Sequence, residues 1–157
     1  MTDAQLERLA QLALAFIRTH PNTPYDLGNL KYNSLKCEKT GEYEYSIFID
    51  LEIAPYQVYL NDYENIPIKV KKAGSEDGVE EYETRYYRNK HYQWWEKMKV
   101  EVAQYLQRFI SDSDGMKSEM DRMQKIIDAQ MAEYGEKMAK IEARKAARAA
   151  KNGGKTK

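Results

Sequence analysis

Residues 43–53 alternate between apolar and polar side chains, and this alternation constrains the fold more than any other stretch. The apolar set is Tyr43, Tyr45, Ile47, Ile49, Leu51 and Ile53, with Phe48 as the one exception on the polar side. A period of two with one apolar side is typical of a half-buried antiparallel strand. Thr40 and Gly41 supply a turn before it, so residues 30–38 are expected to pair with it.

Two further strands are expected after this pair. Residues 66–72 have the composition of a third strand, and Pro67 must lie at its start or on an edge because proline cannot donate to a ladder. Residues 79–88 are expected to return as a fourth strand after a glycine-containing tip at 74–78. The sequence therefore predicts a four-stranded, largely antiparallel sheet.

One helix is predicted before the sheet and another after it. Thr2 and Gln5 form a capping box that starts a helix over residues 3–18. A second helix over residues 89–110 carries an inward stripe formed by Trp94, Met98, Val102, Tyr105 and Phe109. The fold class is therefore α+β, with the helices layered on the sheet, and residues 1–112 form its body.

The C-terminal part of the sequence predicts a long amphipathic helix. It follows a break in which Gly115 suits a cap or a hinge, and it runs to about residue 150. About 35 residues at 1.5 Å each make a rod of roughly 50 Å, too long to pack wholly against such a body. Its apolar stripe is therefore expected to be an interface with another subunit. The stripe consists of Met116, Met120, Met123, Ile127, Met131, Tyr134, Met138 and Ile141.

The charge of the chain is divided between its two ends. Residues 1–136 hold 17 Lys and Arg against 24 Asp and Glu, a net charge of −7, whereas residues 137–157 hold eight against one, a net charge of +7. Blocks of like charge are typical of solvated arms or of seats for an acidic partner. Residues 113–150 are expected to be a helical extension and 151–157 a disordered basic tail. Arg144, Lys145, Arg148 and Lys151 are the candidates for facing DNA.

The sequence contains no pattern of a catalytic, metal or cofactor site. His20 and His91 with the single Cys37 cannot form a zinc site of the common spacings, and Cys37 is expected to be half buried in a strand. Gly28 belongs to no dinucleotide or phosphate-loop motif. No apolar run approaches the roughly 18 residues of a membrane span. We therefore expect a non-enzymatic protein without cofactor or membrane partner, made in the cytoplasm.

Tyrosine is unusually frequent, with 13 residues against 3 phenylalanines. Aromatic and basic residues crowd together in residues 82–95. This cluster fits a stacking platform for single-stranded nucleic acid, a protein–protein interface, or a cover over the core. The interface interpretation is favoured, and its residues are Tyr86, Tyr87, Arg88 and Trp95.

Residues 26–34 and 54–56 carry a motif that resembles a known family. The motif consists of Asp26, Gly28, Asn29, Leu30, Lys31, Ser34, Ala54, Pro55 and Tyr56. It is similar to the turn, strand pair and alanine-proline-tyrosine corner of the tail-completion and minor capsid proteins of long-tailed double-stranded DNA phages. Leu27 stands where that family has threonine, and Lys31 replaces its arginine. If Gly28, at the tip of the turn, takes a positive φ, a side chain at this position would disturb the turn.

The resemblance covers residues 3–110 and implies a structural virion protein of the phage neck, acting in head–tail joining, tail completion or termination. It implies a hexameric homo-oligomeric ring around the DNA channel, in contact with other neck, tail or capsid proteins. The resemblance leaves the role of the long helix open. It also leaves open whether the basic tail makes a weak contact with packaged DNA. Two alternatives remain: a nucleic-acid-binding module that uses the basic tail and the Tyr/Trp/Arg cluster, and a small protein-interaction or inhibitor protein.

Overall fold

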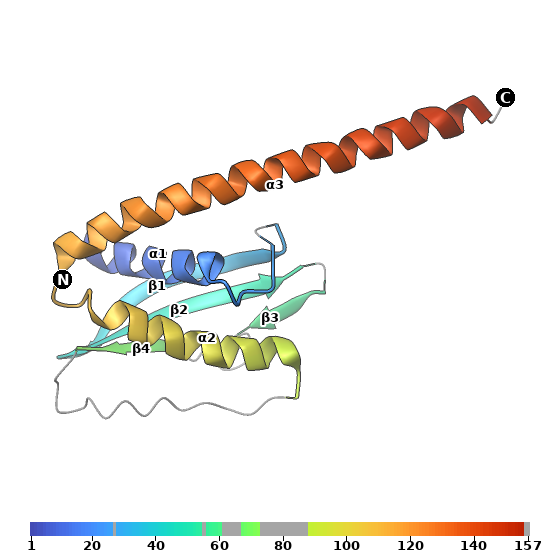
Figure 1. The fold of residues 1–157 in the computed structure, drawn as a ribbon. Coiled ribbons are helices and arrows are strands. Elements are labelled where there is room, and N and C mark those ends of the chain that lie inside the picture. Colours follow the sequence, from blue (N-terminus) through green and yellow to red (C-terminus); the bar gives the residue numbers. More distant parts are fainter. Residues whose placement is uncertain (27, 55, 61–66, 73–87, 156–157) are drawn as a thin grey trace.

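The computed structural model describes residues 1–157 except 27, 55, 61–66, 73–87 and 156–157 (Figure 1). The elements follow in the order α1 (Asp3–Thr19), β1 (Leu30–Gly41), β2 (Glu44–Ile53), β3 (Val58–Leu60), β4 (Ile68–Lys71), α2 (Lys90–Gln107) and α3 (Ser113–Lys155). The fold is α+β, as the sequence predicts, with a helix before an antiparallel sheet and two helices after it.

Strand β2 is the centre of the sheet. It pairs along one edge with β1 in an antiparallel hairpin, from Leu30 opposite Ile53 to Gly41 opposite Glu44. Along its other edge it pairs with β4 near its start and with β3 near its end. The predicted alternation is confirmed from Tyr45 on, because Tyr45, Ile47, Ile49, Leu51 and Ile53 are all buried, whereas Phe48 lies on the other face with the Lys36 ammonium 4.9 Å from its ring centre. Tyr43 is wrongly included in this face, because it lies in the turn before β2 and is 43% exposed.

Of the two further predicted strands, one is confirmed and the other lies almost wholly outside the described residues. The third is present as β4, and Pro67 directly precedes it, in the position that its missing N–H requires. The expected strand at residues 79–88 lies almost wholly outside the described residues, so the fourth strand of the described sheet is β3 instead. β3 has only three residues, too few for an alternating pattern to appear in the sequence.

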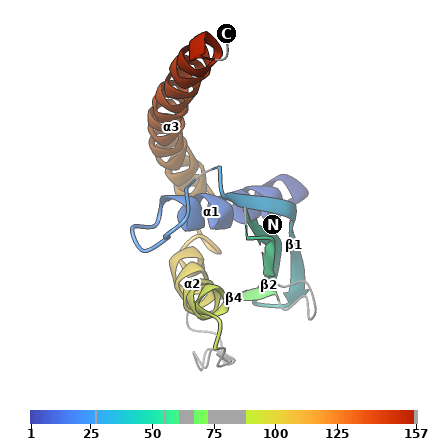
Figure 2. The ribbon, with the colours of Figure 1, turned by 90° about the vertical axis from the view of Figure 1, so that its right-hand side faces the viewer.

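Helices α1 and α2 cover one face of the sheet, as both views show (Figures 1 and 2). α1 packs on β1 and β2, and α2 packs on β3 and β4. The predicted capping box of α1 is confirmed, because Gln5 N–H donates to the Thr2 hydroxyl while Thr2 N–H donates to the Gln5 side chain. At the start of α2 the Asn89 side chain accepts from His91 N–H at 2.8 Å. The core lies between these helices and β2.

Helix α3 has 43 residues, so it is about 65 Å long at 1.5 Å per residue. Its first turn is capped by Asp112, whose carboxylate accepts from Gly115 N–H at 2.9 Å. Gly115 is therefore inside the helix, and its prediction as a cap or hinge is wrong. The helix continues to Lys155, so the disorder predicted from residue 151 is also wrong over residues 151–155. Beyond the body, α3 projects as a single rod (Figure 1).

The first part of α3 belongs to the body. Met116 and Met123 are buried in the same core as α1, with exposed fractions of 0% and 4%. The Thr19 hydroxyl at the end of α1 lies 3.5 Å from the sulfur of Met123. The core therefore continues past residue 112, where the sequence predicts that the body ends.

Candidate assembly surface

The two halves of the family-like motif meet in the structure. The Asp26 carbonyl accepts from the N–H groups of Asn29 and Leu30, at 2.9 and 3.0 Å, and closes the turn before β1. The Asn29 carbonyl in turn accepts from Ala54 N–H at 2.8 Å. The turn and the alanine-proline corner, 25 positions apart, are thus held by one main-chain hydrogen bond at the same end of the sheet.

The remaining motif residues divide between core and surface. Leu30 is buried at the start of β1, whereas Lys31 and Ser34 are exposed. The pairing shifts between Tyr32 and Ser34, which is a bulge at Asn33. Tyr56 is 68% exposed, and Pro55 lies outside the described residues. After this corner Gln57 takes the left-handed conformation, with φ of 54°.

Gly28 lies at a close approach between the turn and α3. Its φ is not in the left-handed range, so the turn does not need glycine for its backbone conformation. A Cβ at this position would instead overlap the hydroxyl and ring of Tyr134 on α3. Close to this contact, the Lys137 ammonium lies 3.9 Å from the Asp26 carboxylate. The turn therefore contacts α3 of the same chain.

Aromatic side chains gather where the corner meets α2. The Tyr25 hydroxyl lies 2.5 Å from His91 Nδ1, and the Tyr25 ring packs edge-on against Trp94 at 5.0 Å. The ring centres of Tyr56 and His91 are 5.7 Å apart. Burial, with the nearby Lys90 charge, lowers the pKa of His91, so its imidazole is neutral at pH 7 and can accept from Tyr25. Sequence reasoning missed this cluster, because its members come from three separate segments.

The predicted aromatic interface is only partly available. Tyr86 and Tyr87 lie outside the described residues, and Arg88 is exposed. Trp95 is 1% exposed and is among the largest buried side chains, so its assignment to an interface is wrong. Trp95 packs in the core together with Met98, whereas Trp94 is half buried.

The apolar stripe of α3 divides into a covered and an uncovered part. Met116 and Met123 are buried, and Met120 and Ile127 are half buried against the same core, so the interface predicted at these four residues is satisfied within the chain. Tyr134 packs against Gly28. The uncovered part consists of Met131, 55% exposed, and Met138, 37% exposed, followed by the half-buried Ile141.

Charge changes sign along the uncovered part of α3. Residues 126–136 hold Asp128, Glu133 and Glu136 and no Lys or Arg, whereas residues 137–151 hold six Lys and Arg against Glu142. The predicted DNA-facing residues Arg144, Lys145, Arg148 and Lys151 are all exposed. They lie on the part of the helix that projects away from the body (Figures 1 and 2).

Neither a metal cluster nor a membrane helix occurs in the described part of the chain. No group of three His, Cys, Asp or Glu side chains is placed to hold a metal ion in residues 1–155 outside the gaps named above. Over the same residues, no helix is long and apolar enough to cross a bilayer.

Comparison with known proteins identifies no relative. No protein-family model, no curated protein and no solved structure matches this chain.

Proposed function

We propose that this chain is a structural subunit of the neck of a long-tailed phage, acting in head–tail joining, tail completion or termination. It forms a ring around the DNA channel by self-association and contacts other neck, tail or capsid proteins. In the virion it lies at the head–tail junction. It carries out no catalysis and binds no cofactor.

The observation that carries the proposal is the uncovered apolar surface of α3. Met131 and Met138 are seven residues apart on a helix that leaves the body, and large apolar side chains exposed in this way mark contact sites when they form part of a patch. Methionine suits such a role because its flexible side chain adapts to different partners. The hydrogen bond between Asn29 and Ala54 adds support, because it joins the two halves of the motif on which the resemblance rests.

The test replaces Met131 and Met138 together by serine. Since both side chains are exposed in the single chain, we expect Tm to change by less than about 2 °C, while cyclic assemblies seen by native mass spectrometry and negative-stain microscopy are lost. The matched control replaces Ala132 and Ala139, also exposed and also seven residues apart, by serine, and it should assemble like the parent chain.

Two outcomes would contradict the proposal. One is a double methionine variant that still forms the cyclic assemblies of the parent chain. The other is absence of the protein from the head–tail junction of purified particles encoded by the same genome, when they are imaged with an antibody against it. The second measurement covers the case in which the isolated subunit is a monomer until its neighbours are present.

The basic end of α3 favours nucleic-acid binding as a second candidate function. Replacing Arg144, Lys145, Arg148 and Lys151 by alanine should then abolish binding to a labelled duplex and flatten its dependence on salt. A protein-interaction or inhibitor protein would instead stay monomeric or dimeric at all concentrations and ignore the duplex.

A further inference from the structure

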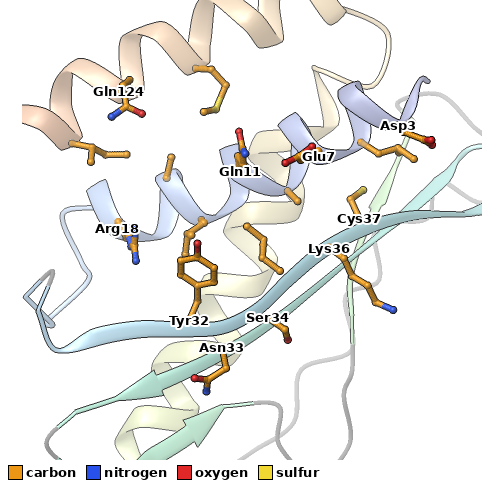
Figure 3. A pocket seen from close by; sticks show the side chains of 17 residues that line it. Asp3, Glu7, Gln11, Arg18, Tyr32, Asn33, Ser34, Lys36, Cys37 and Gln124 are labelled. Atoms are coloured by element: carbon orange, nitrogen blue, oxygen red, sulfur yellow. The ribbon is translucent and has the colours of Figure 1, made fainter.

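A groove of about 870 Å³ runs along one side of α1, and neither the exposed end of α3 nor the aromatic cluster at His91 contributes to it (Figure 3). One face of α1 forms its floor, and its two walls come from β1 and from the first part of α3. Figure 3 shows Arg18 and Tyr32 at one end of the groove and Asp3 with Cys37 toward the other.

The groove lies where one more strand would extend the described sheet beyond β1. The helix layer has the order α2, α1, α3, because α1 packs on both of the other helices. The sheet has β2 between β1 on one side and β3 with β4 on the other. α2 lies on β3 and β4, and α1 lies on β1 and β2, but α3 contacts no strand of the described sheet. The third helix therefore extends past the edge strand, and the space below it beside β1 is the groove.

In the part of the chain that the structure describes, the wall formed by β1 is a free sheet edge. Residues 32–37 all line the groove, and beyond the bulge at Asn33 their side chains alternate between two faces, so the groove reaches the main chain of β1. Within the described residues β1 pairs only with β2. A sheet edge presents unpaired N–H and C=O groups, which an extended segment of another chain can pair with.

The interior of the groove is apolar enough to hold every second side chain of such a segment. Leu6 of α1, Leu35 of β1, and Met120 and Ile127 of α3 line it, and each is only half buried against the core. An added strand would turn alternate side chains onto these four residues, and it would turn the others to solvent.

Arg18 at one end of the groove has no acidic partner. Its guanidinium lies 5.4 Å from the centre of the Tyr32 ring, and its Nε is buried without a hydrogen-bond acceptor. No described carboxylate lies within ion-pair distance of it. Burial of a donor of this kind is costly without an acceptor, and a carboxylate is the acceptor that matches a guanidinium best.

The charge of β1 indicates which segments it can accept. The strand carries Lys31, Lys36 and Lys39 against Glu38 alone, and lysines on an edge strand repel other neutral or basic edges. Lys36 is already paired with Glu38 at 3.1 Å, so Lys31 and Lys39 are the lysines that favour an acidic strand. Asp3 and Glu7 line the groove away from Arg18, so a carboxylate inside the groove is favoured only at the Arg18 end.

We propose that this groove is a docking site for an extended acidic segment of another protein, which adds to the free edge of β1 and places a carboxylate on Arg18. The carboxylate comes from a side chain or from the end of the chain. The proposal depends on the groove alone and holds whether or not the protein is a neck subunit.

The test uses a fluorescent seven-residue peptide with the intact protein as receptor. Valines at positions 3 and 5 face the groove, and glutamates occupy positions 1, 2, 4, 6 and 7, so that a terminal glutamate on the groove side can reach Arg18 in either strand direction. Arg18→Gln should weaken binding at least tenfold, because a hydrogen bond to a charged group contributes about 1.5–3 kcal/mol. The matched control is Arg8→Gln, which removes the same charge from α1 outside the groove and should change affinity less than twofold. The same peptide with lysine in place of every glutamate should not bind. A free peptide C-terminus that binds more tightly than its amide identifies the chain end as the carboxylate.

Backbone pairing is tested separately with N-methylated peptides. In a strand, alternate amides point to opposite edges, so methylation of one set should abolish binding while methylation of the other set leaves it intact. Alternate amides of β1 should gain protection from hydrogen exchange when the peptide is bound. The proposal is overturned if the acidic peptide does not bind at millimolar concentration, if both methylated peptides bind equally, or if a folded Arg18→Gln variant binds as the parent does.

Discussion

At the scale of single residues, small side chains and charges decide how α3 is held on the body. Gly28 makes room for Tyr134, and Glu119 of α3 lies between Arg108 and Arg122. Arg108 stands at the end of α2, so this acidic side chain ties the two helices together at their junction. The first contact joins segments far apart in the sequence and the second joins consecutive helices, and each gives a prediction of its own.

Gly28→Val should destabilise the chain by about 1–3 kcal/mol, because the new side chain collides with Tyr134. The measurement is urea unfolding of four chains: the parent, Gly28→Val, Tyr134→Ala and the double variant. Since Tyr134→Ala removes the colliding ring, the cost of the valine should fall in its presence, with a coupling of about 1 kcal/mol or more. Additive effects of the two changes would show that the glycine is required for its backbone conformation instead.

Glu119→Gln should reduce the dependence of stability on acid pH. Burial tends to raise the pKa of Glu119, but hydrogen bonds from Arg122 and Tyr105 and the charges of Arg122 and Arg108 outweigh it and hold this pKa below its ordinary value. A carboxylate with a lowered pKa stabilises the fold above its unfolded pKa of about 4.3, and this stability is lost as pH falls through the folded value.

At pH 7 the glutamine variant should therefore melt about 3–6 °C lower. Between pH 5 and pH 3 its Tm should fall less steeply than that of the parent. Calorimetry at five pH values in this range measures both effects, and parallel Tm curves would contradict the role of Glu119.

At the scale of elements, α1 explains why α3 cannot be separated from the body. Leu9, Ala10, Leu12, Ala13, Leu14, Ala15 and Ile17 are all buried, which is more than one face of a helix can bury against a sheet. The sheet covers one side and α3 covers another. The near-continuous apolar run of α1 was thus a signal in the sequence that a second element must pack on it.

Two truncations should separate the packed part of α3 from the projecting part. Ending the chain after Asp114 removes Met116 and Met123 from the core, and loss of buried methionines costs about 2–5 kcal/mol each, so cooperative melting should be lost. Ending it after Lys137 keeps the contacts with Gly28 and Asp26, and Tm should stay within about 2 °C. Thermal melting followed by circular dichroism tests both, and equal stability of the two fragments would contradict this division.

At the scale of the whole molecule, patterns within one element were predictable and contacts between elements were not. The alternation in β2, the capping box of Thr2 and the start of α2 depend on neighbours in sequence, and the structure confirms them. Trp94 and Trp95 show where prediction from spacing ends. Met98 lies four residues after Trp94 and three after Trp95, so helical spacing allows either tryptophan to share its face of α2. Only the position of the sheet decides that Trp95 turns inward.

The candidate surfaces follow the same division. The basic run of α3 was visible in the sequence because it depends on composition alone. The interface predicted along the whole apolar stripe was too long, because helical periodicity does not show that α1 covers the first half. The groove beside β1 had no signal in the sequence, since its lining comes from three elements and from main-chain atoms.

Cys37 gives the chain a practical property. Burial, with the charge of Glu38, raises the pKa of its thiol to about 12, so little of it is the reactive thiolate at neutral pH. Maleimide reagents should therefore modify a second cysteine, introduced at the far end of α3, in preference to the native one. Dyes attached there would test the proposed self-association by energy transfer, without any change to the natural sequence elsewhere.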